Sequence, residues 1–400
     1  MSQCISAADA AAALASAERL AAHFASTAVA RDKAGGNAHA EVALLRDSGL
    51  LTLLIAREHG GQGAPWSLAL EVVRRFARVD GSLAHLFGYH FLDQLVTQTC
   101  ASPEQFAALQ RESAKAHWFW GNALNSLDRR VLARREAGGY RLNGVKQFTS
   151  GSPYADRLVI TFRLESDPDT LLRAVIRPDA EGLRIHNDWD AIGQRQTGSG
   201  TVSYDQVWVS DGQVLSGAPV GAEGEVLAFN TLGPILAQLV LTQVFLGSAE
   251  GALAEAARYT REQSRPWHTA GVERAEDDPL VIRQYGEFAA ELEAFRALAE
   301  RASAAWDQAF AQGLALSAEQ RGHTGLQVAA ANVFGGRVAL GITSRVFEVM
   351  GARATASRYG HDRFWRNVRT HTLHNPAEYK LLTLGRHALK GELPVPGFYA

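Results

Sequence analysis

Cysteine is scarce in this chain of 400 residues, which contains only Cys4 and Cys100. Two cysteines so far apart cannot build a disulfide framework or a thiolate metal site. The composition is therefore typical of a protein of a reducing compartment, and we expect it to be cytoplasmic.

Long hydrophobic runs are missing as well. The most apolar stretch, residues 233–247, is interrupted by Gln238 and Gln243, whereas a membrane span needs about 18 or more apolar residues in a row. The alanine-rich start, residues 1–30, carries Asp9 and Glu18, which break the apolar core that a signal peptide requires. We therefore expect no membrane span, and an amphipathic helix at the start.

Charge of one sign is not in excess, because 40 Lys and Arg residues face 42 Asp and Glu residues. No basic block is present that would follow a phosphate backbone, which argues against a nucleic-acid partner. Glycine-rich phosphate loops are also lacking, since neither GxGxxG nor GxxxxGK[ST] follows a predicted strand. If a nucleotide binds, a Rossmann loop does not hold it.

Three regions of the chain differ in the spacing of their apolar residues. In residues 1–117 apolar side chains recur at helical spacing, which predicts a helical domain. Residues 118–224 hold short alternating runs separated by Gly, Asp and Pro, which predict an antiparallel β domain. Long helical patterns return in residues 225–400. Because helices and strands are segregated, the order favours an α+β fold with several domains.

The expected elements are as follows. Strands are predicted at residues 140–148, 158–162, 174–176 and 201–209, with turns at Gly138–Gly139 and Asn143–Gly144. Helices are predicted at residues 235–264, 279–312, 317–333 and 339–351. Four helices of this length indicate a four-helix bundle.

Two histidines near the end of the chain share a short segment, Thr-His-Thr-Leu-His-Asn-Pro, residues 370–376. If this turn is helical, His371 and His374 face the same way, and Pro376 stops the helix behind them. Such a pair moves protons, holds a metal or hydrogen-bonds a charged intermediate. The alternative is two surface histidines before a helix stop.

Motifs along most of the chain resemble those of the dibenzothiophene monooxygenase group of the acyl-CoA dehydrogenase superfamily. They are AVARDKAGG (28–36), GLLTLLIAREHGGQG (49–63), DGSLAHLFGYH (80–90), WGNA (120–123), NGVKQFTSG (143–151), DWDAIGQRQTGS (188–199), RPWHTAG (265–271), RYGHDRFWRNVRTHTLH (358–374) and PVPGF (394–398). The resemblance implies an N-terminal helical domain, a central antiparallel β-barrel and a C-terminal four-helix bundle.

The resemblance also implies a two-component flavin monooxygenase. Such an enzyme takes FMNH2 from a separate NAD(P)H flavin reductase and uses O2 through a flavin C4a-hydroperoxide, here to oxidise an organosulfur or aromatic substrate. FMN is favoured over FAD because no adenine-binding signature is evident, and relatives of this group imply a homotetramer. The dehydrogenases of the superfamily carry a catalytic glutamate, but the two corresponding positions here fall in residues 370–376 and near Ala237. Neither offers a carboxylate base.

Carried over residue by residue, the resemblance places Ser150 beside the reactive edge of the flavin and Asn122 on the pocket wall. Phe148 and Trp189 become walls of the cofactor pocket, with Trp120 and Trp267 as further aromatic candidates and Thr149 and Thr197 as further hydroxyls. Each of these side chains has an ordinary alternative, as a core aromatic or as a polar residue of a strand-to-turn junction.

The resemblance brings His90 to the same cavity as the late histidines. His90 and His374 are then expected to act as an acid/base or peroxide-orienting pair with His371 in support, and the alternative for each is a core histidine. No carboxylate or cysteine accompanies them at ligand spacing, so we expect no metal. Arg265 and Arg353 are expected to bind the flavin phosphate, against the alternative of solvated surface charges.

The substrate pocket is expected to include Phe91, Asp93, Gln94 and Leu124, and the carboxyl group of Asp93 argues against a purely apolar tricyclic substrate. Three alternatives stay open at this point. They are an acyl-CoA dehydrogenase, a flavin monooxygenase of the same fold that hydroxylates nitrogen or carbon, and a non-catalytic protein with a flavoprotein fold.

Overall fold

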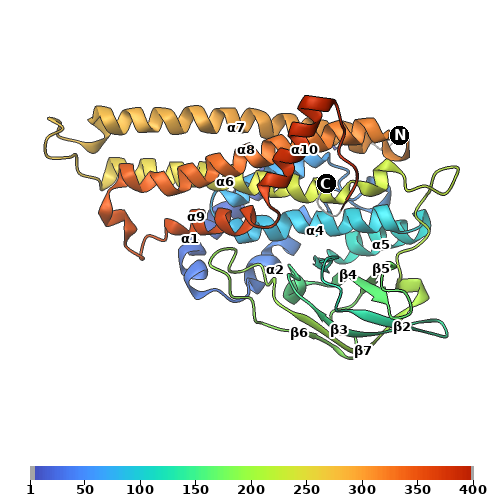
Figure 1. The fold of residues 1–400 in the computed structure, drawn as a ribbon. Helices are drawn as coiled ribbons and strands as arrows, with labels where there is room; N and C mark the ends of the chain where they lie inside the picture. The colour runs from blue at the N-terminus through green and yellow to red at the C-terminus, as the bar shows by residue number, and fades with distance from the viewer. Residues whose placement is uncertain (1–4, 398–400) are drawn as a thin grey trace.

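The computed structural model describes residues 5–397. A layer of long helices lies over a smaller β domain, and helix α4 runs between them (Figure 1). Cys4 and Phe398, which belong to the sequence patterns above, lie outside the described residues.

The N-terminal region is helical, as predicted. Its helices are α1 (Ala7–Ala34), α2 (His39–Asp47), α3 (Trp66–Ala77), α4 (Gly81–Cys100) and α5 (Pro103–Ala116). Side-chain caps define several starts: Ser6 accepts a hydrogen bond from the Asp9 amide, and Asp80 accepts from the amides of Ser82 and Leu83.

Helix α4 is buried along nearly its whole length because it contacts α3, α6, α9 and β1. A Cβ atom on Gly88 would lie 2.4 Å from Cγ1 of Val240, so glycine is what lets α4 and α6 cross closely. The polar side chains of α4 are therefore held in the interior, and they become the centre of the candidate site.

The β domain is one seven-stranded sheet. Its strands run in the order β1-β4-β2-β3-β7-β6, and β5 pairs with β4; their bounds are β1 (Trp120–Ala123), β2 (Leu132–Glu136), β3 (Gly139–Lys146), β4 (Arg157–Leu164), β5 (Leu171–Ile176), β6 (Leu183–Ile185) and β7 (Val202–Ser210). The β1–β4 and β2–β4 pairs are parallel. The expected β domain is present as an open half-barrel. Its other four pairs, β2–β3, β3–β7, β4–β5 and β6–β7, are antiparallel as expected, and among the described strands β1, β5 and β6 each pair with one strand only.

One of the two predicted turns is confirmed and the other is wrong. Gly138 has a φ of 81° in the tight turn between β2 and β3. Asn143 and Gly144 instead lie inside β3, at a register shift where the Asn143 side chain accepts hydrogen bonds from Gln206. An Asn-Gly pair suits a bulge as well as a turn, because both need an unusual backbone.

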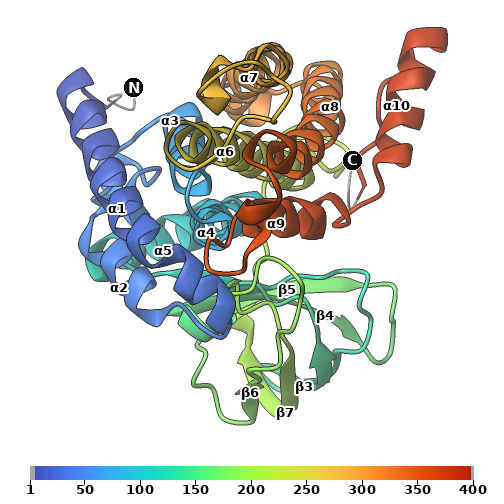
Figure 2. The same ribbon diagram turned by 90° about the vertical axis from the view of Figure 1, so that its left-hand side faces the viewer.

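The C-terminal region consists of α6 (Gly233–Glu262), α7 (Pro279–Ala311), α8 (Ala318–Met350), α9 (Asp362–Thr372) and α10 (Ala377–Lys390). The helices predicted at 317–333 and 339–351 are one continuous helix, α8. Gly335 does not break it but makes room for α7, since a Cβ there would lie 2.1 Å from the Phe295 ring. The bundle therefore has three long helices, α6, α7 and α8, seen end-on in Figure 2.

Helices α6 and α8 are long and apolar enough to cross a membrane, but the apolar window of α6 is 100% buried within the protein. The core clusters explain this composition, because the buried side chains of α6 join those of the N-terminal helices in one hydrophobic core.

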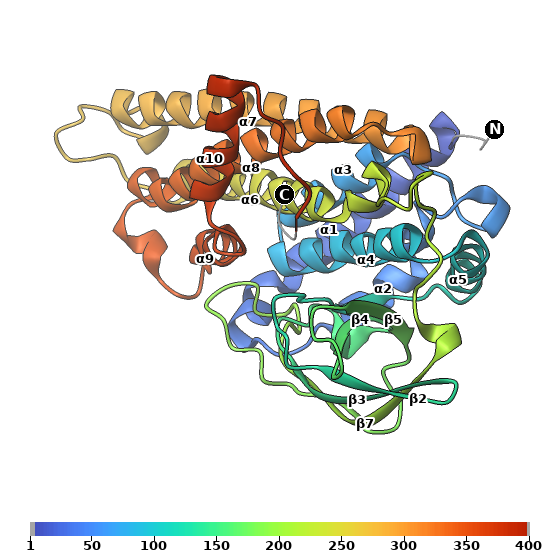
Figure 3. The same cartoon turned by 45° about the vertical axis from the view of Figure 1, so that its right-hand side comes forward.

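The prediction that Pro376 ends the helix of the two histidines is also corrected. Helix α9 already ends at Thr372, so His371 lies in its last turn and His374 lies beyond it. Pro376 is the N-cap residue of α10, where its fixed φ suits a helix start. Figure 3 shows α10 lying across α8.

Candidate functional site

Three polar side chains lie on one face of α4, at spacings of four residues: His85, Tyr89 and Asp93. All three are buried. The rings of His85 and Tyr89 stack with centroids 4.0 Å apart, and the ring of His85 lies 4.6 Å from that of His371 on α9. The histidine of α4 that meets the C-terminal histidines is thus His85, which the sequence analysis missed.

Burial keeps this histidine pair neutral. It lowers the pKa of His85 to about 3, with a smaller contribution from His374. It lowers the pKa of His371 well below its usual value, and the neighbouring His85 and His374 add to the effect. His374 itself is exposed, and its backbone N–H donates to the carbonyl of His371.

Several nitrogens of the pair are unsatisfied. Within residues 5–397, three ring nitrogens have no hydrogen-bond partner: both nitrogens of His85, and Nδ1 of His371. Buried polar atoms of this kind cost free energy unless a partner is supplied, and they recur where a ligand binds. The two imidazoles are therefore available to hydrogen-bond a bound molecule.

His90 is placed differently from the expectation. It is fully buried, its Nδ1 accepts a hydrogen bond from the Trp120 amide at 3.1 Å, and its Nε2 lies 2.9 Å from the Leu51 carbonyl. Because a backbone amide only donates, the proton is on Nε2, and burial lowers the pKa of His90 to about 4. Both ring nitrogens thus contact protein groups, which matches the core-histidine alternative.

Ser150 stands at the end of a hydroxyl relay. Its Oγ lies 2.7 Å from Oγ of Ser199, which lies 2.7 Å from Oγ1 of Thr197, and Thr197 donates to the Gln194 carbonyl. Since a carbonyl only accepts, the direction of the whole relay follows: Ser199 donates to Thr197 and Ser150 donates to Ser199. In this arrangement Ser150 offers lone pairs, and not its proton, to a bound molecule.

Asn122 links the relay to helix α4. Its backbone amide donates to the Ser150 carbonyl, and its side-chain Nδ2 lies 3.5 Å from Oδ2 of Asp93. Asp93 is fully buried, its Oδ1 has no partner within residues 5–397, and burial raises its pKa well above the usual value. Burial therefore favours the uncharged acid form of Asp93, which can both donate and accept a hydrogen bond.

Phe148 is an exposed aromatic residue in a strained backbone. Its φ is 61°, its side chain is 62% exposed, and its ring packs edge-on against Trp189 at 6.1 Å. An L-residue of this size rarely adopts such a φ, and strain of this kind concentrates at functional sites. Trp189 is fixed in turn, because its Nε1 donates to the Gln194 carbonyl that ends the relay.

Arg265 and Arg353 are both exposed, near the ends of α6 and α8. Arg353 donates to the carbonyl of Gln263, two residues before Arg265. Neither guanidinium forms an ion pair with a carboxylate within the described part of the chain, so both are available to an anion. They do not hydrogen-bond Ser150, Asn122 or the histidines within this chain.

The remaining candidates divide between core and surface. Trp120, Thr149 and Phe91 are buried, with the Trp120 indole donating to Ser113 and the Thr149 hydroxyl to the Gly200 carbonyl. Gln94 contacts His90, Leu124 packs beside the cluster around Trp118, and Trp267 is 69% exposed. Among residues 5–397 no group of three or more His, Cys, Asp or Glu side chains is placed to hold a metal.

The spacing of the α4 row was readable in advance. His85, Tyr89 and Asp93 recur every four residues, and between Leu83 and Leu92 the other positions of the helix are apolar or glycine except His90. What the sequence did not show is which of the two histidines, His85 or His90, faces α9, because both lie in a helix that is buried on every side.

Comparison with known proteins places this geometry in a family. Residues 121–207 match the family model described as acyl-CoA dehydrogenase, middle domain, and residues 239–378 match acyl-CoA dehydrogenase, C-terminal domain. The chain is 43% identical to the probable FMNH2-dependent monooxygenase SfnC of Pseudomonas putida, over 97% of each protein.

Two solved structures are similar over nearly the whole chain. The methanesulfinate monooxygenase MsuC of Pseudomonas fluorescens is 46% identical with a TM-score of 0.93, covering 97% of this chain and 99% of that one. The complex of TdsC from Paenibacillus sp. A11-2 with FMN and indole is 41% identical with a TM-score of 0.91, again covering 97% and 99%. TdsC is described as a dibenzothiophene monooxygenase.

Proposed function

Because the chain belongs to the acyl-CoA dehydrogenase superfamily, and within it to the group of FMNH2-dependent monooxygenases that includes SfnC, MsuC and TdsC, we propose that it oxidises an organosulfur compound with FMNH2 and O2. The observation that carries the proposal is the neutral pair of buried histidines, His85 and His371, with ring nitrogens that lack protein partners.

This pair suits oxygen transfer better than dehydrogenation. An acyl-CoA dehydrogenase needs a base strong enough to take a proton from carbon, whereas imidazoles with strongly lowered pKa values are weak bases. A neutral imidazole still has one N–H donor and one acceptor nitrogen. His85 and His371 are therefore placed to orient an oxygen-bearing group without removing a proton from carbon.

The residues present fit a bound FMN. Phe148 and Trp189 offer an aromatic wall, and Ser150 and Asn122 offer polar atoms between that wall and α4. Arg265 and Arg353 supply unpaired charge for the phosphate, which needs such donors when no glycine-rich loop is present. When bound, reduced FMN supplies the electrons that activate O2 for transfer of one oxygen atom to the substrate.

The relay assigns Ser150 a definite task. With its proton directed to Ser199, its Oγ accepts a hydrogen bond from a bound molecule. A reduced flavin carries an N–H at N5, whereas an oxidised flavin carries only a lone pair there, so this orientation favours the reduced form. If Ser150 instead donated its proton to a bound molecule, the relay would have to reverse its direction.

The substrate is an organosulfur compound with a polar group beside the sulfur. Relatives at similar identity are named for different substrates, since MsuC is described as a methanesulfinate monooxygenase and TdsC as a dibenzothiophene monooxygenase. Asp93 supports a polar substrate, because burial raises its pKa and favours the acid form, which beside the Asn122 amide can donate to oxygen and accept from N–H or O–H.

The assembly is a homotetramer that receives FMNH2 in the cytoplasm from a separate flavin reductase. Helix α10 supports a further contact between subunits, since Tyr379, Leu382 and Leu389 are 71%, 50% and 86% exposed. Replacing Leu382 and Leu389 together by Asp should lower the mass measured by light scattering below that of a tetramer, and an unchanged mass would place the subunit contact elsewhere.

The activity is tested with FMN, NADH, a flavin reductase and ¹⁸O2. Methanesulfinate, dimethyl sulfone and dibenzothiophene form the substrate panel, with indole as a sulfur-free comparison. We expect one labelled oxygen per turnover in the product of a sulfur compound, with oxidised FMN alone inactive. Asp93→Leu should lower kcat/KM for the polar substrates more than for dibenzothiophene. Loss of the flavin absorbance on anaerobic addition of an acyl-CoA, with no labelled product, would instead indicate a dehydrogenase.

A further inference from the structure

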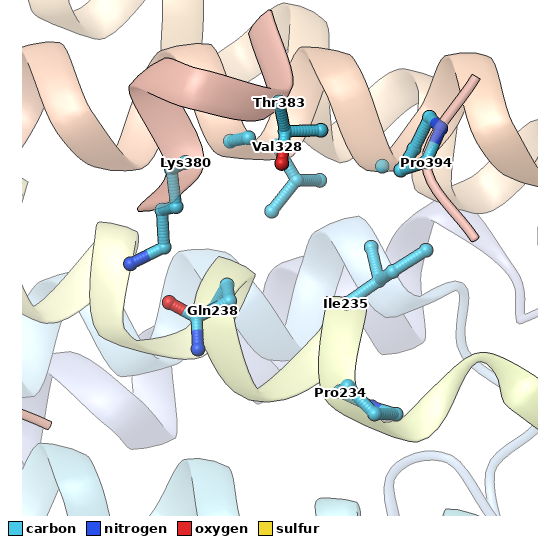
Figure 4. A pocket seen from close by; sticks show the side chains of 9 residues that line it. Pro234, Ile235, Gln238, Val328, Lys380, Thr383 and Pro394 are labelled. Carbon is cyan, nitrogen blue, oxygen red and sulfur yellow. The ribbon is translucent and has the colours of Figure 1, made fainter. Parts of the chain in front are cut away.

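A small cavity lies on the other side of α6 from α4, where α6, α8, α10 and the C-terminal segment meet. Its lining includes Ile235 and Gln238 of α6, Val328 of α8, Lys380 of α10 and Pro394. Figure 4 shows apolar side chains on one side of this space and the polar ends of Lys380 and Gln238 on the other. None of its lining residues belongs to the candidate flavin site.

Gln238 is the first unusual feature of this cavity. Its side chain is only 5% exposed, yet neither Nε2 nor Oε1 has a hydrogen-bond partner within residues 5–397. A buried amide with both ends unsatisfied costs stability, and a leucine of similar size would avoid that cost. The amide borders the cavity, so a molecule held there would supply the missing partners.

Lys380 is the second unusual feature of this cavity. It is buried, and its Nζ donates to Oδ1 of Asn375 at 2.7 Å. It forms no ion pair with any described carboxylate, although an ammonium group has three hydrogens to donate. Figure 4 shows its Nζ directed toward the Gln238 amide. A buried cation without a carboxylate partner calls for an anion beside it.

The size and the walls of the cavity define the anion. About 40 Å³ is open to the centres of water-sized molecules, which is room for about three such centres and far too little for a flavin or a tricyclic ring. We propose that this cavity binds a small organic monoanion, a carboxylate or sulfinate with a methyl-sized group, whose oxygens contact Lys380 and Gln238 and whose carbon packs against Ile235 and Val328.

Acetate is the probe, and the flavin-free protein is titrated with sodium acetate against sodium chloride at matched ionic strength. We expect a saturable rise in melting temperature and selective broadening of the methyl signal of acetate in NMR. Lys380→Met and Gln238→Leu should each weaken acetate binding by about tenfold or more. Lys390→Met, on the exposed side of the same helix, should bind acetate like the unaltered protein.

Gln238→Leu separates a ligand site from a packing defect. We expect this variant to melt at a higher temperature without acetate, because an unsatisfied amide is gone, while losing the response to acetate. The proposal is overturned if acetate does not bind, or if both cavity variants bind it as well as Lys390→Met does. Neither result bears on the monooxygenase assignment, because flavin is absent from the experiment.

Discussion

The imidazole rings of His85 and His371 lie with their centroids 4.6 Å apart, at the contact between α4 and α9. Burial keeps both rings neutral, so they sit together without the repulsion that two imidazolium ions would feel. The same burial leaves their free nitrogens to a bound molecule. This contact joins the segment where dehydrogenases of the fold carry their base to the central helix of the protein.

Removing either imidazole should uncouple oxygen activation from product formation. For His85→Phe and His371→Phe we expect product formation to fall by about 100-fold or more, while FMNH2 is still consumed and hydrogen peroxide is released. Product and peroxide are measured together per NADH oxidised.

Two other histidines serve as controls for this experiment. His23→Gln changes an exposed histidine and should leave the ratio of product to peroxide unchanged. His90→Phe removes the contacts to Trp120 and Leu51, so it should lower the melting temperature. If His90→Phe uncouples a stable enzyme while His371→Phe does not, the roles assigned to these histidines are wrong.

Replacing Phe148 by glycine should make the protein more stable and weaken its binding of FMN. Glycine adopts a φ near 61° without strain, so Phe148→Gly should raise the free energy of unfolding of the flavin-free protein by about 1 kcal/mol. The lost ring contact should weaken FMN binding by about tenfold. Urea unfolding and fluorescence titration measure the two effects.

The matched control is His117→Gly. His117 also has a positive φ, 48°, at the end of α5, and its side chain is exposed. We expect the same gain in stability with unchanged FMN affinity. Equal FMN affinity in Phe148→Gly and the unaltered protein would remove Phe148 from the cofactor site.

Local patterns predicted the elements better than their contacts. The strand around residues 140–148 and the helix around 235–264 were visible from the local spacing of their apolar residues. The continuity of α8 was not visible, because Gly335 looks like a break until the Phe295 ring beside it is known. The choice between His85 and His90 was likewise a question of tertiary packing, since α4 is covered on all sides.

The two arginines should bind phosphate specifically. Arg265→Gln and Arg353→Gln should each weaken FMN binding by about tenfold, since a charge-assisted hydrogen bond contributes about 1.5–3 kcal/mol. Riboflavin, which lacks the phosphate, should bind all forms alike. Arg301→Gln, an exposed arginine of α7, is the control. A similar loss of riboflavin affinity would indicate that the substitutions disturb the fold or the subunit contact instead.

Acid should destabilise the protein through its buried histidines. The native pKa values of His85 and His90 are about 3 and about 4, and that of His371 is also far below the unfolded value near 6.5. As pH falls below 6.5 the unfolded chain therefore binds protons that the native protein does not. The free energy of unfolding falls by about 1.4 kcal/mol per pH unit for each such histidine.

Asp93 changes the free energy of unfolding with pH in the direction opposite to that of the histidines, so the two kinds of variant should differ in the sign of their effect. Its native pKa is raised, so above pH 3.8 the native protein holds a proton that the unfolded chain releases. Between pH 6.5 and 4.5, His85→Phe should flatten the decline by about 1.4 kcal/mol per pH unit, and Asp93→Leu should steepen it. Urea unfolding of the flavin-free protein at three pH values measures both slopes. Parallel curves for the unaltered protein and both variants would mean that neither His85 nor Asp93 keeps its uncharged form on folding. That result would contradict the uncharged site described for α4.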